Sequence, residues 1–169
     1  MSEDDAPDLL PLLDRLRLTA DERRIFLRTD TEATLAKVEM LTAAAVYLNG
    51  SAVRVYGGRL GSTRGIELVE QVVGAAFQTF GGVDPHPGPF PKAAMLLRGI
   101  TAGHPFQDGN KRTGFLIAVY YLKAVDRPLP AELAVDSVVD LSWRVSKGEL
   151  RDVDAIAATL ERLWLTQLC

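Results

Sequence analysis

Two apolar runs that enclose a short polar stretch constrain this chain more than any other feature. Residues 91–102 and 115–122 carry apolar side chains on most sides of an expected helix, and a helix that is apolar all round belongs in a core. Between them, residues 104–114 read His-Pro-Phe-Gln-Asp-Gly-Asn-Lys-Arg-Thr-Gly. Ionisable groups between buried helices are unfavourable unless they are paired or face a cleft. The sequence therefore predicts a functional site in the connection between two core helices.

This connection has the composition of a phosphate-binding helix start. Asp108 and Asn110 are favoured N-cap residues and Gly109 permits a tight turn, so we expect a helix to begin near Asn110. Free N–H groups and the helix dipole attract anions at such an end. Arg112 adds a forked cation and Lys111 a point charge. The dipole disfavours both cations at this position, which argues against a role as plain surface charges.

Asp108 and His104 supply the other parts of a phosphate-transfer site. A carboxylate beside a phosphate is repelled unless a cation such as Mg²⁺ lies between them, so Asp108 is the expected metal ligand. His104 stands at the start of the connection, where an imidazole can take a proton from an incoming hydroxyl. Taken singly, a structural histidine and a simple helix cap explain these two residues equally well. Their combination with the basic helix start favours phosphate transfer.

The run from His104 to Thr113 resembles the signature of the Fic superfamily, and most closely that of its death-on-curing (Doc) toxin branch. The Fic pattern is His-Pro-Phe-x-(Asp/Glu)-Gly-Asn-Gly-Arg-x-x-Arg, and the Doc pattern is close to His-x-Phe-x-Asp-Ala-Asn-Lys-Arg-Thr. Lys111 and Phe115 stand where Fic adenylyltransferases have glycine and the second arginine, as they do in Doc, whereas Pro105 and Gly109 are the Fic-like choices. The resemblance covers about residues 38–164, including a glycine-rich segment at 56–61 and a turn at 147–150.

The resemblance implies a reaction and a set of roles. ATP would sit with its γ-phosphate toward the acceptor, a threonine or serine of a protein, which is elongation factor Tu for known Doc toxins. Translation would then arrest, and a small antitoxin protein would inhibit the toxin. The implied catalytic residues are His104 as general base, Asp108 as the Mg²⁺ ligand and Arg112; the implied phosphate cradle is Gly109, Asn110, Lys111 and Arg112. Phe106 is expected to anchor the loop in the core.

The expected fold class is all-α, a Fic/Doc-like helical bundle with a small β-hairpin or extended flap. Val53, Val55 and Tyr56 give the only good β-type alternation, ahead of several glycines. We therefore place the flap at residues 53–64, where a free edge can hold a target segment as an added strand. A plain glycine-rich connection explains the segment equally well, and only the resemblance favours a flap. The residues expected to dock the target are Val55, Tyr56, Gly57 and Gly58.

Helical periodicity and stop signals predict the remaining elements. Helices are expected at about residues 7–18, 31–48, 66–80, 131–147 and 152–164, with an irregular loop at 81–91. Thr19 and Glu22 form a capping-box pattern for another helix to about residue 28. Asn49-Gly50 and Gly148 are expected to end the helices before them; Leu35, Phe80 and Trp143 are expected to be available to the core. We divide the chain into an N-terminal helical extension, 1–37, and a Fic/Doc-like catalytic domain, 38–169.

The composition is that of an ordinary small globular domain and excludes several classes. The 169 residues are 47% apolar and 24% charged, with a net charge of −3 and no basic stripe, so direct nucleic-acid binding is not expected. Cys169 is the only cysteine, which rules out an internal disulfide or a cysteine-based zinc site. No signal peptide and no apolar run of membrane-spanning length is seen, so we expect a cytoplasmic protein without a membrane segment.

Three alternatives stay open on sequence alone. The nearest is AMP transfer by a Fic-type adenylyltransferase, which Pro105 and Gly109 favour slightly. A non-catalytic module that binds a nucleotide or a partner is the second, and the intact His104, Asp108 and Arg112 argue against it. Transfer from another phosphorylated donor is the third.

Overall fold

The computed structural model describes residues 9–131 and 133–165 as a helical protein. Its elements are η1 (Leu10–Arg15), α2 (Ala20–Leu27), α3 (Thr31–Tyr56), α4 (Ile66–Gly74), η2 (Ala75–Phe77), α5 (Pro89–Gly103), α6 (Asn110–Ala124), α7 (Val135–Ser146) and α8 (Val153–Leu165). Within these residues the only β pairing is two isolated antiparallel bridges, Ser62 with Phe106 and Phe80 with Val83. The all-α expectation is confirmed. Of the expected β-hairpin or extended flap, the structure has the extended segment, which lies against the motif loop.

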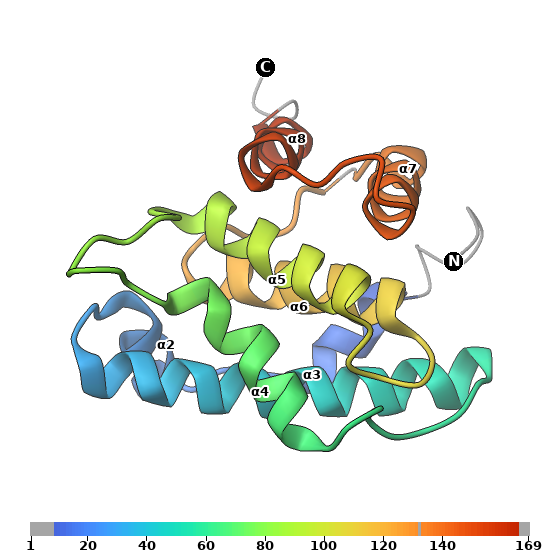
Figure 1. Cartoon of the computed structure of the whole chain (residues 1–169), viewed down its shortest axis with the longest axis horizontal. Helices are drawn as coiled ribbons and strands as arrows, with labels where there is room; N and C mark the ends of the chain where they lie inside the picture. Colours follow the sequence, from blue (N-terminus) through green and yellow to red (C-terminus); the bar gives the residue numbers. More distant parts are fainter. Residues whose placement is uncertain (1–8, 132, 166–169) are drawn as a thin grey trace.

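The helices form layers around the pair α5 and α6, which pack side by side at the centre. α2, α3 and α4 cover one side of this pair, and α7 and α8 cover the other (Figure 1). Both central helices are largely buried, as their apolar sequences predict. They approach each other closely at Gly114, where an added Cβ would lie 3.0 Å from the Leu97 carbonyl oxygen and collide with Thr101 Oγ1. The polar connection between α5 and α6 therefore starts and ends in the core.

Local signals set several helix ends as predicted. The Glu22 N–H donates to Thr19 Oγ1 at 3.2 Å and the Thr19 N–H donates to Glu22 Oε2 at 2.7 Å, which completes the capping box of α2. Gly148 has φ 73°, and its N–H donates to the Val145 carbonyl at 3.1 Å after the last turn of α7. Both ends follow from side-chain and backbone chemistry within a few residues.

The prediction that Asn49-Gly50 ends a helix is wrong, because α3 continues to Tyr56. Its buried face continues through Ala52 and Val53, and this packing outweighs the roughly 1 kcal/mol that a glycine costs in a helix interior. Val55 and Tyr56 are accordingly helical and not part of a strand. The extended flap begins only at Gly57.

Three side chains expected to be available to the core are exposed instead. Leu35 and Phe80 are each 67% exposed, and Trp143 is 40% exposed. The prediction placed Phe80 at the end of a 66–80 helix, but α4 ends at Gly74 and the 3₁₀ segment η2 ends at Phe77. The Phe80 backbone instead pairs with Val83 in a short turn. Apolar spacing alone does not tell which side of a helix a neighbour covers. Two predicted helices also differ in extent. The predicted 131–147 helix begins only at Val135. The predicted 7–18 helix is a short 3₁₀ segment, Leu10–Arg15, and its predicted start at residue 7 lies outside the described residues.

The N-terminal elements pack into the same core as the motif helices. Leu13 of η1 and Phe26 of α2 are buried, and the Phe26 ring meets the Tyr120 ring of α6 edge-on, with centroids 6.5 Å apart. The expected division between residues 37 and 38 falls inside the continuous helix α3. Residues 9–37 thus cover core surface that α6 would otherwise expose.

Candidate active site

His104 ends α5 in an unusual backbone conformation. It is the C-cap residue, with φ 48° and ψ 52°, and its side chain is exposed to solvent. This left-handed conformation costs a residue with a side chain about 1–2 kcal/mol, so neighbouring contacts must hold it. One such contact is the Thr63 hydroxyl, which donates to the His104 carbonyl at 3.2 Å. The imidazole is therefore presented at the surface from a fixed backbone position.

The loop after His104 is closed by Phe106 and Asn110. The Phe106 ring is buried, as predicted for an anchor. Asn110 Oδ1 accepts from the Phe106 N–H at 3.0 Å, and Asn110 Nδ2 donates to the Phe106 carbonyl at 2.8 Å. Since the amide is buried and bonded through both its oxygen and its nitrogen, the Asn110 side chain holds the loop together.

The extended flap pairs with this loop. The Thr63 N–H donates to the Pro105 carbonyl at 2.8 Å, and the Gln107 N–H donates to the Gly61 carbonyl at 3.0 Å. These two bonds flank the Ser62–Phe106 bridge. The flap is thus fixed along the motif loop, beside His104.

Asn49 of α3 fixes the other end of the loop. Its Nδ2 donates to the Asp108 carbonyl at 2.8 Å and to Thr113 Oγ1 at 3.1 Å. Gly109, with φ 77°, leaves room for this amide, because an added Cβ would lie 3.1 Å from Asn49 Nδ2. The sequence pattern predicts a helix end at Asn49 and not this role. The signal that indicates it is a single amide side chain within an apolar helical stretch, because a buried amide needs hydrogen-bond partners.

The Asp108 side chain points toward the flap and does not cap α6. The N-cap of α6 is Gly109, with no side-chain cap bond. Asp108 Oδ2 accepts from the Arg59 N–H at 2.7 Å, and Arg59 Nε lies 3.9 Å from the same oxygen. Gly58 lies so close that an added Cβ would be 2.8 Å from Asp108 Cβ. The carboxylate is nevertheless 43% exposed.

The single Asp108 carboxylate fits a Mg²⁺ ion that arrives bound to substrate phosphates better than a metal ion held by protein side chains alone. Among residues 9–131 and 133–165, no group of three or more His, Cys, Asp or Glu side chains is placed to hold a metal ion. Mg²⁺ commonly binds through one or two carboxylates, substrate phosphates and water. Asp108 keeps acceptor capacity beyond its bond to Arg59, since a carboxylate has about four lone-pair sites.

The two cations of the first turn of α6 each lie over an aromatic ring. Lys111 Nζ is 4.4 Å from the ring centroid of Trp143 in α7, and Arg112 Cζ is 4.5 Å from that of Tyr56 at the end of α3. Cation–π contacts of this type contribute about 0.5–2 kcal/mol each. They hold two like charges apart at a helix end whose dipole disfavours both.

Comparison with known proteins identifies this arrangement. A sequence profile described as the Fic/DOC family matches residues 40–122. The chain is also 34% identical over 126 residues to Toxin Doc of Mycolicibacterium smegmatis, a match that covers 75% of this chain and 89% of that protein. The chain belongs to the Fic/Doc family. Its motif residues place it in the Doc branch, as the resemblance suggested.

The structure brings together most of the residues predicted from the Doc motif. His104, Asp108, Lys111 and Arg112 border one loop and the start of one helix. Phe115, in the position of the second Fic arginine, is buried in the core. The predicted docking residues divide: Gly57 and Gly58 lie in the extended flap, while Val55 and Tyr56 belong to α3, and Tyr56 contacts Arg112.

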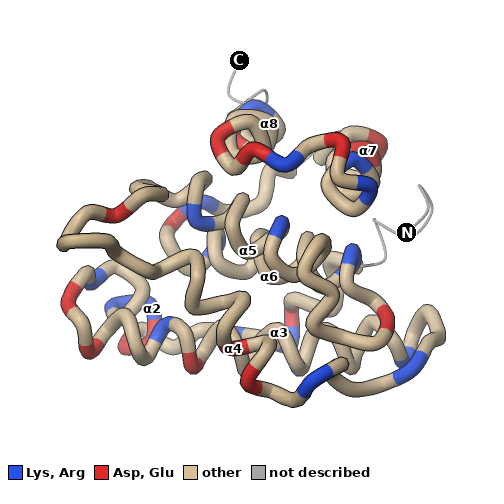
Figure 2. The backbone as a smooth tube through the Cα atoms, viewed as in Figure 1, with Lys and Arg blue, Asp and Glu red and all other residues tan. Residues whose placement is uncertain are grey.

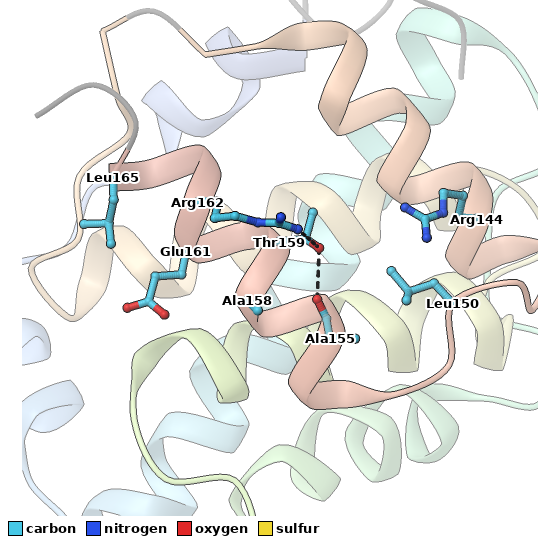
Figure 3. Close-up of a pocket in the computed structure, with 8 residues that line it drawn as sticks. All are labelled: Arg144, Leu150, Ala155, Ala158, Thr159, Glu161, Arg162 and Leu165. Atoms are coloured by element: carbon cyan, nitrogen blue, oxygen red, sulfur yellow. Dashed lines mark hydrogen bonds between the residues drawn. The ribbon is translucent and has the colours of Figure 1, made fainter. Parts of the chain in front are cut away.

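One hollow of the described surface lies away from these residues. A groove of about 840 Å³ lies between α7 and α8, lined by Leu150, Ala158 and Leu165 among others (Figure 3). The only hydrogen bonds that Figure 3 marks are local to α8, from Thr159 Oγ1 to the Ala155 carbonyl at 2.9 Å and from Arg162 Nη2 to Thr159 Oγ1 at 3.3 Å. The groove contains no histidine or cysteine and none of the motif residues. Chemistry therefore points to the surface around His104, outside this groove.

None of the described helices combines the length and apolar character that crossing a bilayer requires.

Proposed function

We propose that this chain is a Doc-like toxin that transfers the γ-phosphate of ATP to a threonine or serine hydroxyl of a protein. The target we propose is a translation factor resembling elongation factor Tu, so that the reaction arrests translation in the cytoplasm. A small antitoxin protein is the proposed partner that holds the activity in check. The relative named Toxin Doc and the motif it shares support this reading.

One observation favours phosphate transfer over AMP transfer. At position 111 an AMP-transferring relative has glycine, and here a lysine ammonium lies 4.4 Å from the Trp143 ring beside the helix start. The space that a glycine leaves open is filled by a charged side chain. The second arginine of the Fic pattern is replaced by buried Phe115, which cannot bind phosphate. This chain therefore lacks both the glycine and the second arginine that would help to turn the α-phosphate toward the acceptor.

His104 is the proposed general base. Its exposed imidazole takes the proton of the acceptor hydroxyl as the oxygen forms a bond to the γ-phosphorus. The bond from that phosphorus to the bridging oxygen breaks at the same centre, and ADP leaves. The left-handed backbone at His104 and the bond from Thr63 hold the base in place, since this reaction depends mainly on positioning.

The first turn of α6 is the proposed phosphate cradle. The backbone N–H groups that follow Gly109 point out of the helix end, and Lys111 and Arg112 add cations held by aromatic rings. Asp108 is the proposed Mg²⁺ ligand, and the ion would neutralise charge on the phosphates. Asn110 acts through the loop that it closes and through its backbone.

The flap is the proposed docking surface for the target segment. Gly57 and Gly58 are exposed and extended, and the paired flap lies next to His104. A target chain that adds to this segment by backbone hydrogen bonds would bring its hydroxyl to the imidazole.

The test is transfer of label from γ-labelled ATP to proteins of a bacterial lysate. We expect His104→Ala to abolish transfer while the melting temperature stays within a few degrees, because the exposed imidazole contributes little packing. Gln107→Ala, an exposed neighbour in the same loop, is the control and should keep activity. Full activity of the His104 variant would overturn the assignment of the base.

A further inference from the structure

A small cavity lined by three basic side chains lies beside the motif, and the Doc resemblance assigns no role to these three side chains. Its volume is about 370 Å³, and Arg98, Lys147 and Arg151 contribute to its wall together with Ala102 and Ser146. These cations come from α5, from the end of α7 and from the connection to α8. Figure 2 shows basic positions on α5, on α7 and on that connection. Ala102 is two residues before His104, so the cavity adjoins the candidate active site.

No acidic side chain lines this basic cavity. Glu149 and Asp152, the nearest carboxylates in sequence, are exposed and lie outside its wall. Three cations around one small cavity repel one another unless an anion lies between them. The arrangement therefore has the electrostatic character of an anion site.

One of the three cations is held in place by the local backbone. Arg151 Nε donates to the Gly148 carbonyl at 2.8 Å. At Gly148 an added Cβ would lie 2.9 Å from Arg151 Nη2, and its φ is 73°. The glycine that ends α7 thus also makes room for the guanidinium. A guanidinium fixed in this way loses less conformational freedom when it binds an oxyanion.

Lys147 connects the basic cavity with the phosphate cradle. Its Nζ lies 5.3 Å from the Trp143 ring centroid, and Lys111 Nζ lies 4.4 Å from the same centroid. The two ammonium groups are therefore no more than about 10 Å apart. A chain of phosphate groups can span such a separation, with one end at α6 and the other at the cavity.

We propose that Arg98, Lys147 and Arg151 form a second anion subsite, which binds phosphate groups of the polyphosphate donor beyond the α6 cradle. Trp143 is its positioning residue, because the indole holds Lys111 and Lys147 over one ring. This inference rests on the proposed function, since it takes ATP as the donor. It adds α7 and the α7–α8 connection, which lie outside residues 40–122, to the site.

Equilibrium binding of ATP and of inorganic tripolyphosphate to the full chain tests the subsite without requiring turnover. The variant is Arg98→Gln/Arg151→Gln. The matched control is Arg17→Gln/Arg24→Gln, which removes the same charge from two exposed positions, one after η1 and one in α2. We expect the first pair to weaken both ligands about tenfold or more, as loss of charge-assisted contacts does. The control pair should change affinity less than about twofold.

A second variant and a spectroscopic readout distinguish a loss of binding from misfolding of the double variant. Lys147→Met keeps the apolar stem and removes only the exposed ammonium, and it should weaken tripolyphosphate binding by a similar factor. In a Trp164→Phe background Trp143 is the remaining tryptophan. Its emission should then change on addition of tripolyphosphate, and change less in the Lys147→Met protein.

Each outcome decides between the inference and the proposed function. Equal tripolyphosphate affinity of the wild type and both cavity variants would overturn the subsite and leave γ-phosphate transfer intact. If the cavity variants lose transfer but keep their ATP and tripolyphosphate affinity, the cavity binds the acceptor protein and not the donor, and the proposed subsite is overturned. Weakened binding in a protein that transfers no γ-phosphate would support the subsite and count against the proposed function.

Discussion

Replacing Asn49 by alanine tests whether α3 holds the motif loop in place. The buried amide makes two hydrogen bonds, to the Asp108 carbonyl at 2.8 Å and to Thr113 Oγ1 at 3.1 Å. Each such bond contributes about 1 kcal/mol net, and partners left buried and unbonded add to the loss. We therefore expect Asn49→Ala to lower the free energy of unfolding by roughly 2–3 kcal/mol. The transfer rate should fall about tenfold or more, because the loop carries His104 and Asp108.

Urea denaturation followed by circular dichroism measures the stability change. Thr42→Val is the matched control: Thr42 is also buried on α3, but its hydroxyl makes no hydrogen bond within the described structure. The control should be neutral or slightly stabilising, since it removes an unsatisfied buried group. Thr113→Val, which removes one of the two Asn49 partners, should cost about 1 kcal/mol and be less than additive with Asn49→Ala. An Asn49→Ala protein within about 0.5 kcal/mol of wild type would refute the reasoning.

Three further predictions concern packing, pH and the flap. Gly114→Ala should lower stability by about 1–3 kcal/mol, because α5 leaves no room for a Cβ; an unchanged melting temperature would contradict it. Burial alone would raise the pKa of the Asp84 carboxyl, but the hydrogen bonds from Lys92 at 2.6 Å and from the His86 N–H at 2.9 Å, together with the positive charge of Lys92, outweigh it and lower that pKa. The stability that Asp84 contributes is thus present above the ordinary aspartate pKa and lost as the pH falls through the lower folded value. Denaturation of wild type and Asp84→Asn should differ at pH 7 and converge below about pH 4, and a constant difference would oppose this. Gly58→Ala should displace the flap from Asp108 and reduce transfer. Its tripolyphosphate affinity should stay unchanged, whereas the cavity variants should lower that affinity.

The central part of the fold could be predicted from sequence because its signals are local. The two apolar runs define α5 and α6, and the helix start near Asn110 follows from the turn residues before it. The Thr19–Glu22 capping box and the end of α7 at Gly148 also depend on neighbours only a few residues away. The family motif adds the identity of the site, since it occupies one continuous stretch.

The rest depends on contacts between segments that are distant in sequence. Asn49 looked like a helix stop because its partners lie 59 and 64 residues away. Trp143 looked like a core residue, although its ring lies at the surface beneath two lysines. The flap has no strand signal of its own, because its pairing partner is the motif loop and not an adjacent strand. Periodicity shows that a residue is apolar or helical, and only the tertiary structure shows what it meets.

The central claim is that Lys111 and its surroundings direct the γ-phosphate of ATP to a protein hydroxyl. The most direct measurement compares purified protein with two batches of ATP, labelled at the γ- or the α-phosphate, on one bacterial lysate, with His104→Ala as the blank. The account predicts label on a protein from the γ-position only, and none with the His104 variant. Label from the α-position would contradict it and would mean that this Doc-branch protein transfers AMP despite Lys111.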